Sequence, residues 1–336
     1  MKTEKHTPIS SLGEFKLIDK LTQPFESSVA STVKAVGDDA AIIDCGDKYM
    51  VLSTDLMLEG IHFDLTYFPL KHLGFKAVVV AISDICAMNA RASQLTVSLG
   101  LSSKISVEML EELYEGINLA CKAYGVDLVG GDTSASVNGL TISLTAVGFA
   151  DKDKVVYRSG AKENDLICVS GNLGAAYMGL RLLEREKRVL TDVDDKQPKF
   201  EGYKYLLQKQ LRPEARVDVV DEMASMNVVP TSMIDVSDGL AFDLRHICSA
   251  SNVGARIYLD RLPIAQEVYN LCEELHNDPV TAVFNGGDEY ELLFTLPLEK
   301  QEVAIALGAD IIGHITAEQT GVALVTPDGG EISLEH

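Results

Sequence analysis

The sequence predicts an α/β or α+β fold that is divided into two domains. The chain has 336 residues, 46% of them hydrophobic, which suits two domains of ordinary size. Strand-like and helix-like segments are mixed throughout both halves. A polar stretch at 151–154 separates the halves, so we expect domains at 1–150 and 151–333. Residues 334–336, Leu-Glu-His, resemble the start of a cloning-derived histidine tag and are left out of this prediction.

Capping residues place two helices in the first half. Ser11 and Glu14 have the spacing of a capping box, which predicts a helix near the N-terminus. Ser106 and Gly125 bracket an amphipathic segment, which predicts a helix at 106–124. The rest of this half is predicted as a loop at 22–37, strands at 40–45, 49–53, 92–101, 126–129 and 140–149, and a helix at 71–88.

The second half is predicted to begin with a strand at 166–170, a glycine-rich turn and a helix at 175–185. A run of charged residues extends from Glu184 to Lys199, and we interpret it, with the neighbouring residues to 200, as a solvated surface loop. The remaining predictions are helices at 217–226, 240–251, 264–275 and from 298, and strands at 231–236, 255–259, 290–296 and near 311.

The charge balance excludes several classes of partner. Lys and Arg number 29 and Asp and Glu 50, which gives a net charge of −21. Such a chain repels nucleic acid and anionic membrane surfaces, and it repels phosphate ligands unless cations intervene. No apolar run reaches the roughly 18 residues of a membrane helix. The six cysteines have no close pair and the N-terminus lacks the apolar core of a signal peptide, so we expect reduced thiols and a cytoplasmic location.

Several acidic residues lie beside Gly, Ser or Thr at the predicted ends of apolar segments. Asp in such a place is usually a turn former or an N-cap, and that interpretation holds for each one singly. The repetition of the pattern, with small neighbours that let a ligand approach the backbone, favours ligand binding instead. The motifs are Gly37-Asp38-Asp39, Ser53-Thr54-Asp55, Ser83-Asp84, Gly130-Gly131-Asp132, Asp235-Val236-Ser237-Asp238-Gly239 and Gly286-Gly287-Asp288-Glu289.

Asp84 is the most informative of these acids. On a helix its neighbours three and four residues away are all apolar, so its carboxylate costs several kcal/mol unless it is paired or binds a metal. A buried salt bridge and a metal site both satisfy this condition. Hard cations take oxygen ligands, and Mg²⁺ is held by a few carboxylates together with substrate phosphates. Several Mg²⁺ ions that bind a polyphosphate would reconcile the acidic chain with a phosphate ligand.

Other nucleotide and metal motifs are missing from the sequence. It contains no P-loop and no protein-kinase motif set. The turn Gly171-Asn-Leu-Gly174 suits an anion at a helix N-terminus, although a plain helix start explains it equally. Calcium storage is the main alternative outside enzymes, but a loop that begins at Asp235 has His246, not Glu, at its twelfth position.

Taken in order along almost the whole chain, the motifs resemble the thiamine-monophosphate kinases of the aminoimidazole-ribonucleotide synthetase superfamily. The segment from Ser53 to Phe63, Ser-Thr-Asp-Leu-Met-Leu-Glu-Gly-Ile-His-Phe, is the most specific part. The other parts are Gly13-Glu-Phe-Lys-Leu-Ile18, Gly37-Asp-Asp-Ala-Ala41, Ser83-Asp84 with Ala87-Met88, Gly130-Gly-Asp-Thr133, Arg158-Ser-Gly-Ala-Lys162, Asp235-Val-Ser-Asp-Gly-Leu240 and Gly286-Gly-Asp-Glu-Tyr-Glu-Leu292.

The resemblance implies a fold and a reaction. The N-terminal domain would build a β-barrel together with that of a second copy in a homodimer, and the C-terminal domain would close over a cleft. ATP would donate its γ-phosphoryl group to thiamine monophosphate in the last step of thiamine diphosphate biosynthesis, assisted by several Mg²⁺ ions.

The resemblance also implies roles for individual residues. The expected metal ligands are Asp39, Ser53, Thr54, Asp55, Asp84, Asp132, Asp235 and Asp238, and the expected catalytic residues are Asp55, Asp84, Asp132 and Asp238. The expected ATP contacts are Gly131, Asp132, Arg158 and Ser237, and the expected contacts to thiamine monophosphate are His62, Asp288 and Glu289.

Two features depart from the family pattern. The family commonly reads Gly-Gly-Glu-Asp, whereas this chain has Asp288 followed by Glu289, so the lengths of the two acids are exchanged. The family also tends to end in an aromatic-rich tail, whereas this chain contains no Trp and ends in Leu-Glu-His. We therefore expect the aromatic contact to the thiamine to be either truncated or supplied by another residue.

Overall fold

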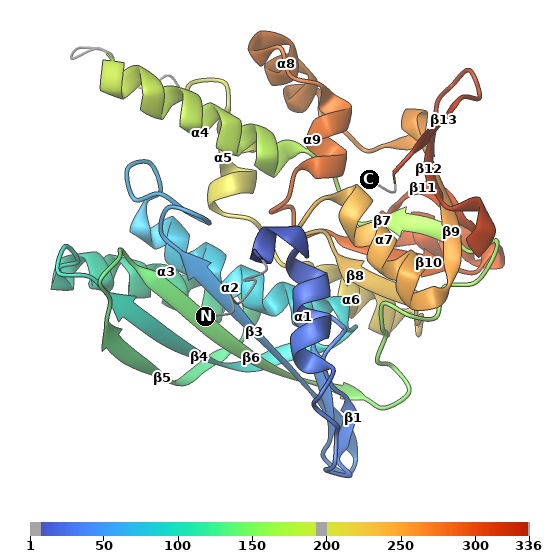
Figure 1. The fold of residues 1–336 in the computed structure, drawn as a ribbon, viewed down its shortest axis with the longest axis horizontal. Helices are drawn as coiled ribbons and strands as arrows, with labels where there is room; N and C mark the ends of the chain where they lie inside the picture. Colours follow the sequence, from blue (N-terminus) through green and yellow to red (C-terminus); the bar gives the residue numbers. More distant parts are fainter. Residues whose placement is uncertain (1–7, 193–199, 335–336) are drawn as a thin grey trace, which may run out of the picture.

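The computed structural model describes residues 8–192 and 200–334, and it contains two mixed sheets with helices packed against them (Figure 1). The first sheet has the strand order β1-β2-β3-β6-β4-β5, and the second has the order β13-β12-β9-β11-β7-β10-β8. The two-domain α/β fold with mixed sheets is therefore confirmed. No helix of the described residues is long and apolar enough to cross a membrane.

The elements follow one another along the chain without long gaps. The strands of the first sheet are β1 (Thr32–Lys34), β2 (Ala41–Asp44), β3 (Lys48–Leu58), β4 (Arg91–Leu101), β5 (Asp127–Ala135) and β6 (Thr141–Asp151). Those of the second sheet are β7 (Leu166–Val169), β8 (Ser232–Asp235), β9 (Val253–Tyr258), β10 (Leu292–Leu296), β11 (Asp310–Ala317), β12 (Val322–Val325) and β13 (Glu331–Ser333). The helices are α1 (Glu14–Thr22), α2 (Leu70–Ala87), α3 (Val107–Tyr124), α4 (Ala175–Asp192), α5 (Lys204–Leu211), α6 (Val217–Ser225), α7 (Leu240–Ser251), α8 (Gln266–Leu275), α9 (Pro279–Asn285) and α10 (Gln301–Ala306).

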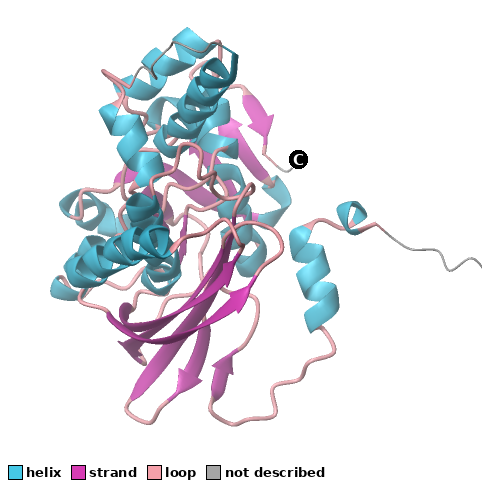
Figure 2. Cartoon of the chain, turned by 90° about the vertical axis from the view of Figure 1, so that its left-hand side faces the viewer, coloured by secondary structure: helices cyan, strands magenta, loops and turns pink. Residues whose placement is uncertain are grey.

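Helix α2 is the central element of the molecule. It contacts β3, β4 and β6 of the first sheet and β8 of the second, and most of its residues are buried. A helix that is apolar on nearly all sides is expected in such a place. Helix α3 packs against α2, and in Figure 2 helices cover one side of the first sheet while the N-terminal helix α1 stands apart on the right. The end of α2, with Ser83 and Asp84, therefore lies where the two sheets meet.

The first sheet is open in the described part of the chain, so one copy forms no closed barrel. Strand β5 is at its edge and pairs only with β4, in parallel, and all nine of its residues are exposed. Strand β3 pairs along its full length with β6, but β2 covers only residues 49–52 of its other side. Residues 53–58 of β3 and the whole outer side of β5 thus leave backbone groups without a strand partner among the described residues.

Several predicted boundaries are correct and others are wrong. Ser106 accepts a hydrogen bond from the backbone of Met109, and Gly125 ends α3 in the left-handed conformation, as predicted. The capping box at Ser11 is wrong. Gly13, with φ 73°, precedes α1, and the Ser11 hydroxyl donates to the Pro8 carbonyl instead.

The strand and helix ends near the motifs are also longer than predicted. β3 continues to Leu58 and β5 to Ala135, because cross-strand pairing holds Ser, Thr and Gly residues in the extended conformation. The charged run that we predicted as a loop from Glu184 is helical as far as Asp192, since Glu, Lys and Arg are good helix formers. The prediction missed β1, α5, α9, β12 and β13. Residues 193–199 of the charged run and the last two residues of the tag-like end lie outside the described residues.

Two glycines let α2 and α3 approach each other closely. A Cβ added at Gly74 would lie 2.0 Å from the Leu113 carbonyl oxygen, and one added at Gly116 would lie 1.9 Å from the Lys71 carbonyl oxygen. Backbone atoms cannot move aside as the end of a flexible side chain can. The helices would have to separate to accept any larger residue.

Gly116→Ala is therefore expected to destabilise the fold by about 1 to 3 kcal/mol, which is the usual cost of overpacking. A thermal melt should show a melting temperature lower by several degrees. The matched control is Glu111→Ala on the exposed side of the same helix, which should leave the melting temperature nearly unchanged. Equal melting temperatures for Gly116→Ala and the wild type would contradict the close approach.

Candidate active site

A cluster of carboxylates lies at the junction of the two sheets. Oxygen atoms of Asp39, Asp84 and Asp235 lie within 4.8 Å of one another. Asp39 comes from the turn before β2, Asp84 from the last turns of α2, and Asp235 from the end of β8. Segments that are distant in the sequence and belong to both sheets thus bring three acids to one point.

Two serines orient these acids. The Ser83 hydroxyl donates to Asp235 Oδ2 at 2.5 Å, and the Ser53 hydroxyl donates to Asp84 Oδ2. Ser53 and Asp55 are two residues apart on β3, so both side chains lie on the face of the sheet that α2 covers. Asp55 Oδ2 is buried without a hydrogen-bond partner among the described residues.

Arg158 is the cation that contacts the cluster directly. Its Nε and Nη2 atoms donate to Asp39 Oδ1 at 3.1 and 2.6 Å, and its backbone N–H donates to Asp38 Oδ1 at 3.0 Å. The second oxygen of Asp39, Oδ2, remains buried without a hydrogen-bond partner in the described residues. One guanidinium therefore satisfies only part of the cluster.

The remaining negative charge shifts the acid–base properties of the cluster. Burial raises the pKa of Asp39 to about 7 even though Arg158 opposes the shift. Burial, and then the charge of Asp235, raises the pKa of Asp55 to about 7. The pKa of Asp84 is raised well above its usual value by burial and by Asp55, Asp235 and Asp39, and burial also raises the pKa of Asp235.

The donor set fits hard divalent cations. Carboxylate and hydroxyl oxygens are the ligands that Mg²⁺ prefers, and here they converge from several elements. Buried carboxylate oxygens without partners are costly, and a cation that binds among them would remove that cost. Asp39, Asp55, Asp84 and Asp235 could hold such ions, with Ser53 as a supporting oxygen.

The loop after β8 carries two further predicted residues. Ser237 is half-buried, and the exposed Asp238 lines a cleft of about 730 Å³ between the start of α1 and α7. The walls of this cleft also include Lys16, Phe242 and Arg245, which are basic or aromatic. A polyanion with an aromatic base could bind such a surface.

Sequence reasoning missed Asp243, which holds this loop in place. Its buried Oδ2 accepts hydrogen bonds from the backbone N–H groups of Asp238 and Gly239, at 3.3 and 3.1 Å. The available signal was an acid in the first turn of the helix that directly follows the Asp-Gly motif.

Three predicted residues do not reach the cluster within one chain. Thr54 points to the opposite face of β3, where its hydroxyl donates to the Leu144 carbonyl at 3.1 Å, because side chains alternate along a strand. Gly131 lies in the same cross-strand row as Asp55, but three strands away, which is about 14 Å. Asp132 is next to it, exposed on the opposite face.

The predicted acceptor contacts lie at a separate pocket. His62 and Asp288 line a cavity of about 490 Å³ between the segment after β3 and α4. His62 Nδ1 accepts a hydrogen bond from the Leu58 backbone at 3.0 Å, so in the neutral ring the proton is on Nε2, which can donate to a ligand.

Asp288 is held by a buried lysine that the sequence analysis missed. Lys76 Nζ lies 2.9 Å from Asp288 Oδ2, and the Tyr290 hydroxyl donates to Asp288 Oδ1 at 2.6 Å. Burial alone would raise the pKa of Asp288, but Lys76 and the hydrogen bond from Tyr290 lower it overall. The signal for Lys76 was a single charge in the apolar run 75–82 of α2.

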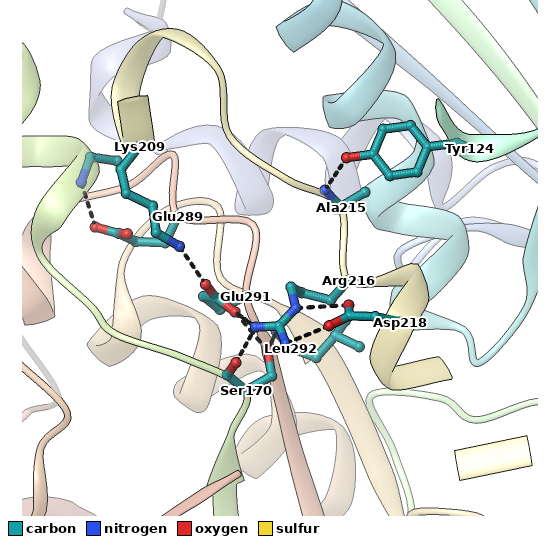
Figure 3. A network of polar contacts seen from close by, with 10 residues as sticks. Tyr124, Ser170, Lys209, Ala215, Arg216, Asp218, Glu289, Glu291 and Leu292 are labelled. Atoms are coloured by element: carbon teal, nitrogen blue, oxygen red, sulfur yellow. Dashed lines mark hydrogen bonds and ion pairs between the residues drawn. The ribbon is translucent and has the colours of Figure 1, made fainter. Parts of the chain in front are cut away.

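Glu289 points away from this pocket. Its Oε1 accepts a hydrogen bond from the Ala176 backbone at 3.0 Å, at the N-terminus of α4, and burial raises its pKa to about 8. The helix start after the Gly171–Gly174 turn is therefore occupied by a carboxyl group of the chain itself. Nearby, the buried Glu291 accepts from Lys209 and Arg216, which lie on either side of it in Figure 3.

Comparison with known proteins supports one family. Two family models match the chain. The N-terminal domain of AIR synthase related proteins matches residues 37–150, and the C-terminal domain of the same proteins matches residues 162–326. The thiamine-monophosphate kinase of Aquifex aeolicus is 34% identical over 87% of this chain and 88% of its own length. That of Bacillus subtilis is 32% identical over 96% and 98%.

The chain belongs to the thiamine-monophosphate kinase family. A solved structure of a family member, AaThiL in complex with AMPPCP and TMP, superimposes with a TM-score of 0.83 at 32% identity, over 98% of this chain and 97% of that one. Thiamine-monophosphate kinases are phosphotransferases, and so is this chain.

The raised pKa values of the cluster lead to a prediction about stability. Between pH of about 4 and about 7 the folded protein holds protons on Asp39 and Asp55 that the unfolded chain has released, so stability from these groups is lost as the pH rises through this window. The melting temperature of metal-free protein should therefore fall from about pH 5 to about pH 8 by several degrees.

Millimolar Mg²⁺ should reverse this loss at the higher pH, because a bound cation replaces the protons. It should have much less effect at the lower pH, where protons compete. Asp84→Asn should reduce the Mg²⁺ effect at the higher pH. A melting temperature that does not respond to Mg²⁺ at either pH would contradict a cation site here.

Proposed function

We propose that this enzyme transfers the γ-phosphoryl group of ATP to thiamine monophosphate, with the help of several Mg²⁺ ions, and forms thiamine diphosphate and ADP. The observation that carries the proposal is the carboxylate cluster at the junction of the sheets, where Asp39 Oδ2 and Asp55 Oδ2 are buried without a hydrogen-bond partner in the part of the chain that the structure describes. Its donors suit cations that bind phosphates, and family membership supports the choice of substrates. With six free cysteines and ATP as donor, we place the reaction in the cytoplasm.

The acceptor determines what the site must do. A phosphate monoester is already anionic near neutral pH, so its oxygen can attack without a strong general base. The site must overcome the repulsion between two phosphates and align them in line. When bound, the cations would neutralise charge on both phosphates. Asp39, Asp55, Asp84 and Asp235 would fix the cations, and Arg158 would hold Asp39 in place.

The two substrates would approach the cluster from different sides. The basic cleft at Asp238 is suited to ATP, with Ser237 and Asp238 near its phosphates. The pocket with His62 and Asp288 is suited to thiamine monophosphate, since it offers a donor and a fixed carboxylate. The cleft borders the loop 235–239, and the acceptor pocket borders the segment 286–291. These two segments are joined by a hydrogen bond from the Asp288 backbone to the Ser237 carbonyl at 2.9 Å.

We infer that the active form is a homodimer in which each site uses both chains. The free outer side of β5 and the free side of β3 at 53–58 offer complementary backbone groups. Exposed apolar residues lie on the same strands, namely Leu56 on β3 and Leu128 and Val129 on β5. If β5 of the partner added to β3, the two open sheets would close into a barrel. The partner's Gly-Gly-Asp segment would then lie beside Ser53 and Asp55.

Asp55→Ala and Asp84→Ala should each reduce turnover more than about 100-fold, because each removes an anchor for the cations. The dimer should survive in both, since Asp84 lies on α2, and the Asp55 side chain faces α2 while its substitution leaves the backbone groups of the β3 edge unchanged. Steady-state assays of thiamine diphosphate formation and size-exclusion chromatography test this. The control is Asp260→Asn on the exposed turn after β9, which should retain full activity. Unchanged kinetics in either Ala variant would disprove the cation mechanism.

Complementation tests the shared site. Asp55→Ala and Asp132→Ala should each be inactive alone. After mixing, unfolding and refolding, half of the dimers are mixed, and each mixed dimer has one intact site. Activity should therefore recover to about one quarter of the wild-type value. No recovery, with mixed dimers verified by differential tags, would show that each site is built from one chain.

A further inference from the structure

We propose that Lys76 is a positioning residue for the phosphate acceptor and acts by fixing the carboxylate of Asp288 at the wall of the acceptor pocket. The inference rests on the proposed function and names a determinant of acceptor affinity within it. Lys76 is 1% exposed, whereas lysine is almost never fully buried without a partner.

The ammonium group of Lys76 forms an ion pair with Asp288 and also contacts a backbone carbonyl and two aromatic rings. Its ammonium donates to Asp288 Oδ2 at 2.9 Å and to the Gln210 carbonyl at 3.1 Å. The rings of Phe68 and Tyr290 lie with their centroids 5.7 and 6.0 Å from the same nitrogen. In the described residues, Asp288 is the only acid within ion-pair distance of Lys76. This carboxylate is consequently needed to balance the buried charge.

Both the side chain and the backbone of Asp288 are held by hydrogen bonds. Its φ of 67° is unusual for a residue with a side chain, so the surrounding contacts must hold it there. Tyr290 donates to Oδ1, Lys76 donates to Oδ2, and the Asp288 backbone donates to Ser237. The side chain is still 34% exposed and lines the pocket with His62.

A carboxylate with a fixed direction recognises a ligand better than a mobile one, because no side-chain entropy is lost on binding. Lys76 also belongs to α2, which carries Ser83 and Asp84 two turns further on. The Lys76–Asp288 pair therefore links the acceptor pocket to the helix that builds the carboxylate cluster. Thiamine monophosphate offers an amino group and a cationic ring that a fixed carboxylate can bind.

The test is a double-mutant cycle in the full-length protein with Lys76→Met, Asp288→Asn and the combination. Met fills the space of the lysine stem, and Asp288 is exposed enough to be solvated, so folding should persist. Isothermal titration with thiamine monophosphate alone, and steady-state kinetics, give the acceptor Kd and KM. Lys76→Met should raise both about 10-fold and leave the KM for ATP unchanged. The double variant should be no worse than Asp288→Asn, because Lys76 acts through that residue.

Lys71→Met, on the exposed side of the same helix, is the control and should match the wild type. Lys76→Met with unchanged acceptor Kd and a lower melting temperature would show a purely structural lysine and overturn the proposal. Effects that multiply in the double variant would also overturn it, because Lys76 would then act on the ligand independently. A wild type that neither binds nor phosphorylates thiamine monophosphate would instead refute the proposed function.

Discussion

The repulsion among carboxylates at the junction of the sheets is the constraint on which the rest of the structure depends. Asp39, Asp84 and Asp235 share one small volume, and among these three acids Arg158 forms its ion pair with Asp39. Protons can neutralise such a cluster at low pH. Near neutral pH, protons neutralise it only if the pKa values of the acids are raised, whereas bound cations neutralise it while the acids stay ionised. The cations proposed to arrive with the phosphates would reconcile a net charge of −21 with a phosphate substrate.

The fold serves this junction. Helix α2 is buried between the sheets. It lies close to α3 because Gly74 and Gly116 have no side chains that would separate the two helices. The same helix carries Lys76 toward the acceptor pocket and Asp84 toward the cluster, so one rigid element sets the spacing of the two. The second sheet contributes the segments 235–239 and 286–291 to the carboxylate cluster and to the acceptor pocket. Backbone hydrogen bonds between the two segments hold them in register.

The sequence was sufficient to predict the elements with strong periodicity or caps and the acids beside small residues. It could not show which acids meet, because Asp39, Asp84 and Asp235 converge only through tertiary packing. Thr54 and Glu289 lie away from the places that the sequence predicted for them, for physical reasons. Strand alternation turns Thr54 away, and the N-terminus of α4 binds the Glu289 carboxylate. Lys76 and Asp243 were missed because the role of a buried charge becomes clear only when its partners are known. The partner of Lys76, Asp288, is distant in the sequence, and Asp243 binds backbone groups.

The most direct test of the account is where cations bind. Crystals grown with Mn²⁺, a non-hydrolysable ATP analogue and thiamine monophosphate would give an anomalous difference map in which manganese is identified by its own scattering. The account predicts peaks at about 2.2 Å from carboxylate oxygens of Asp39, Asp84 and Asp235, and between these acids and the nucleotide phosphates. Nucleotide phosphates bound without manganese among these acids would contradict it.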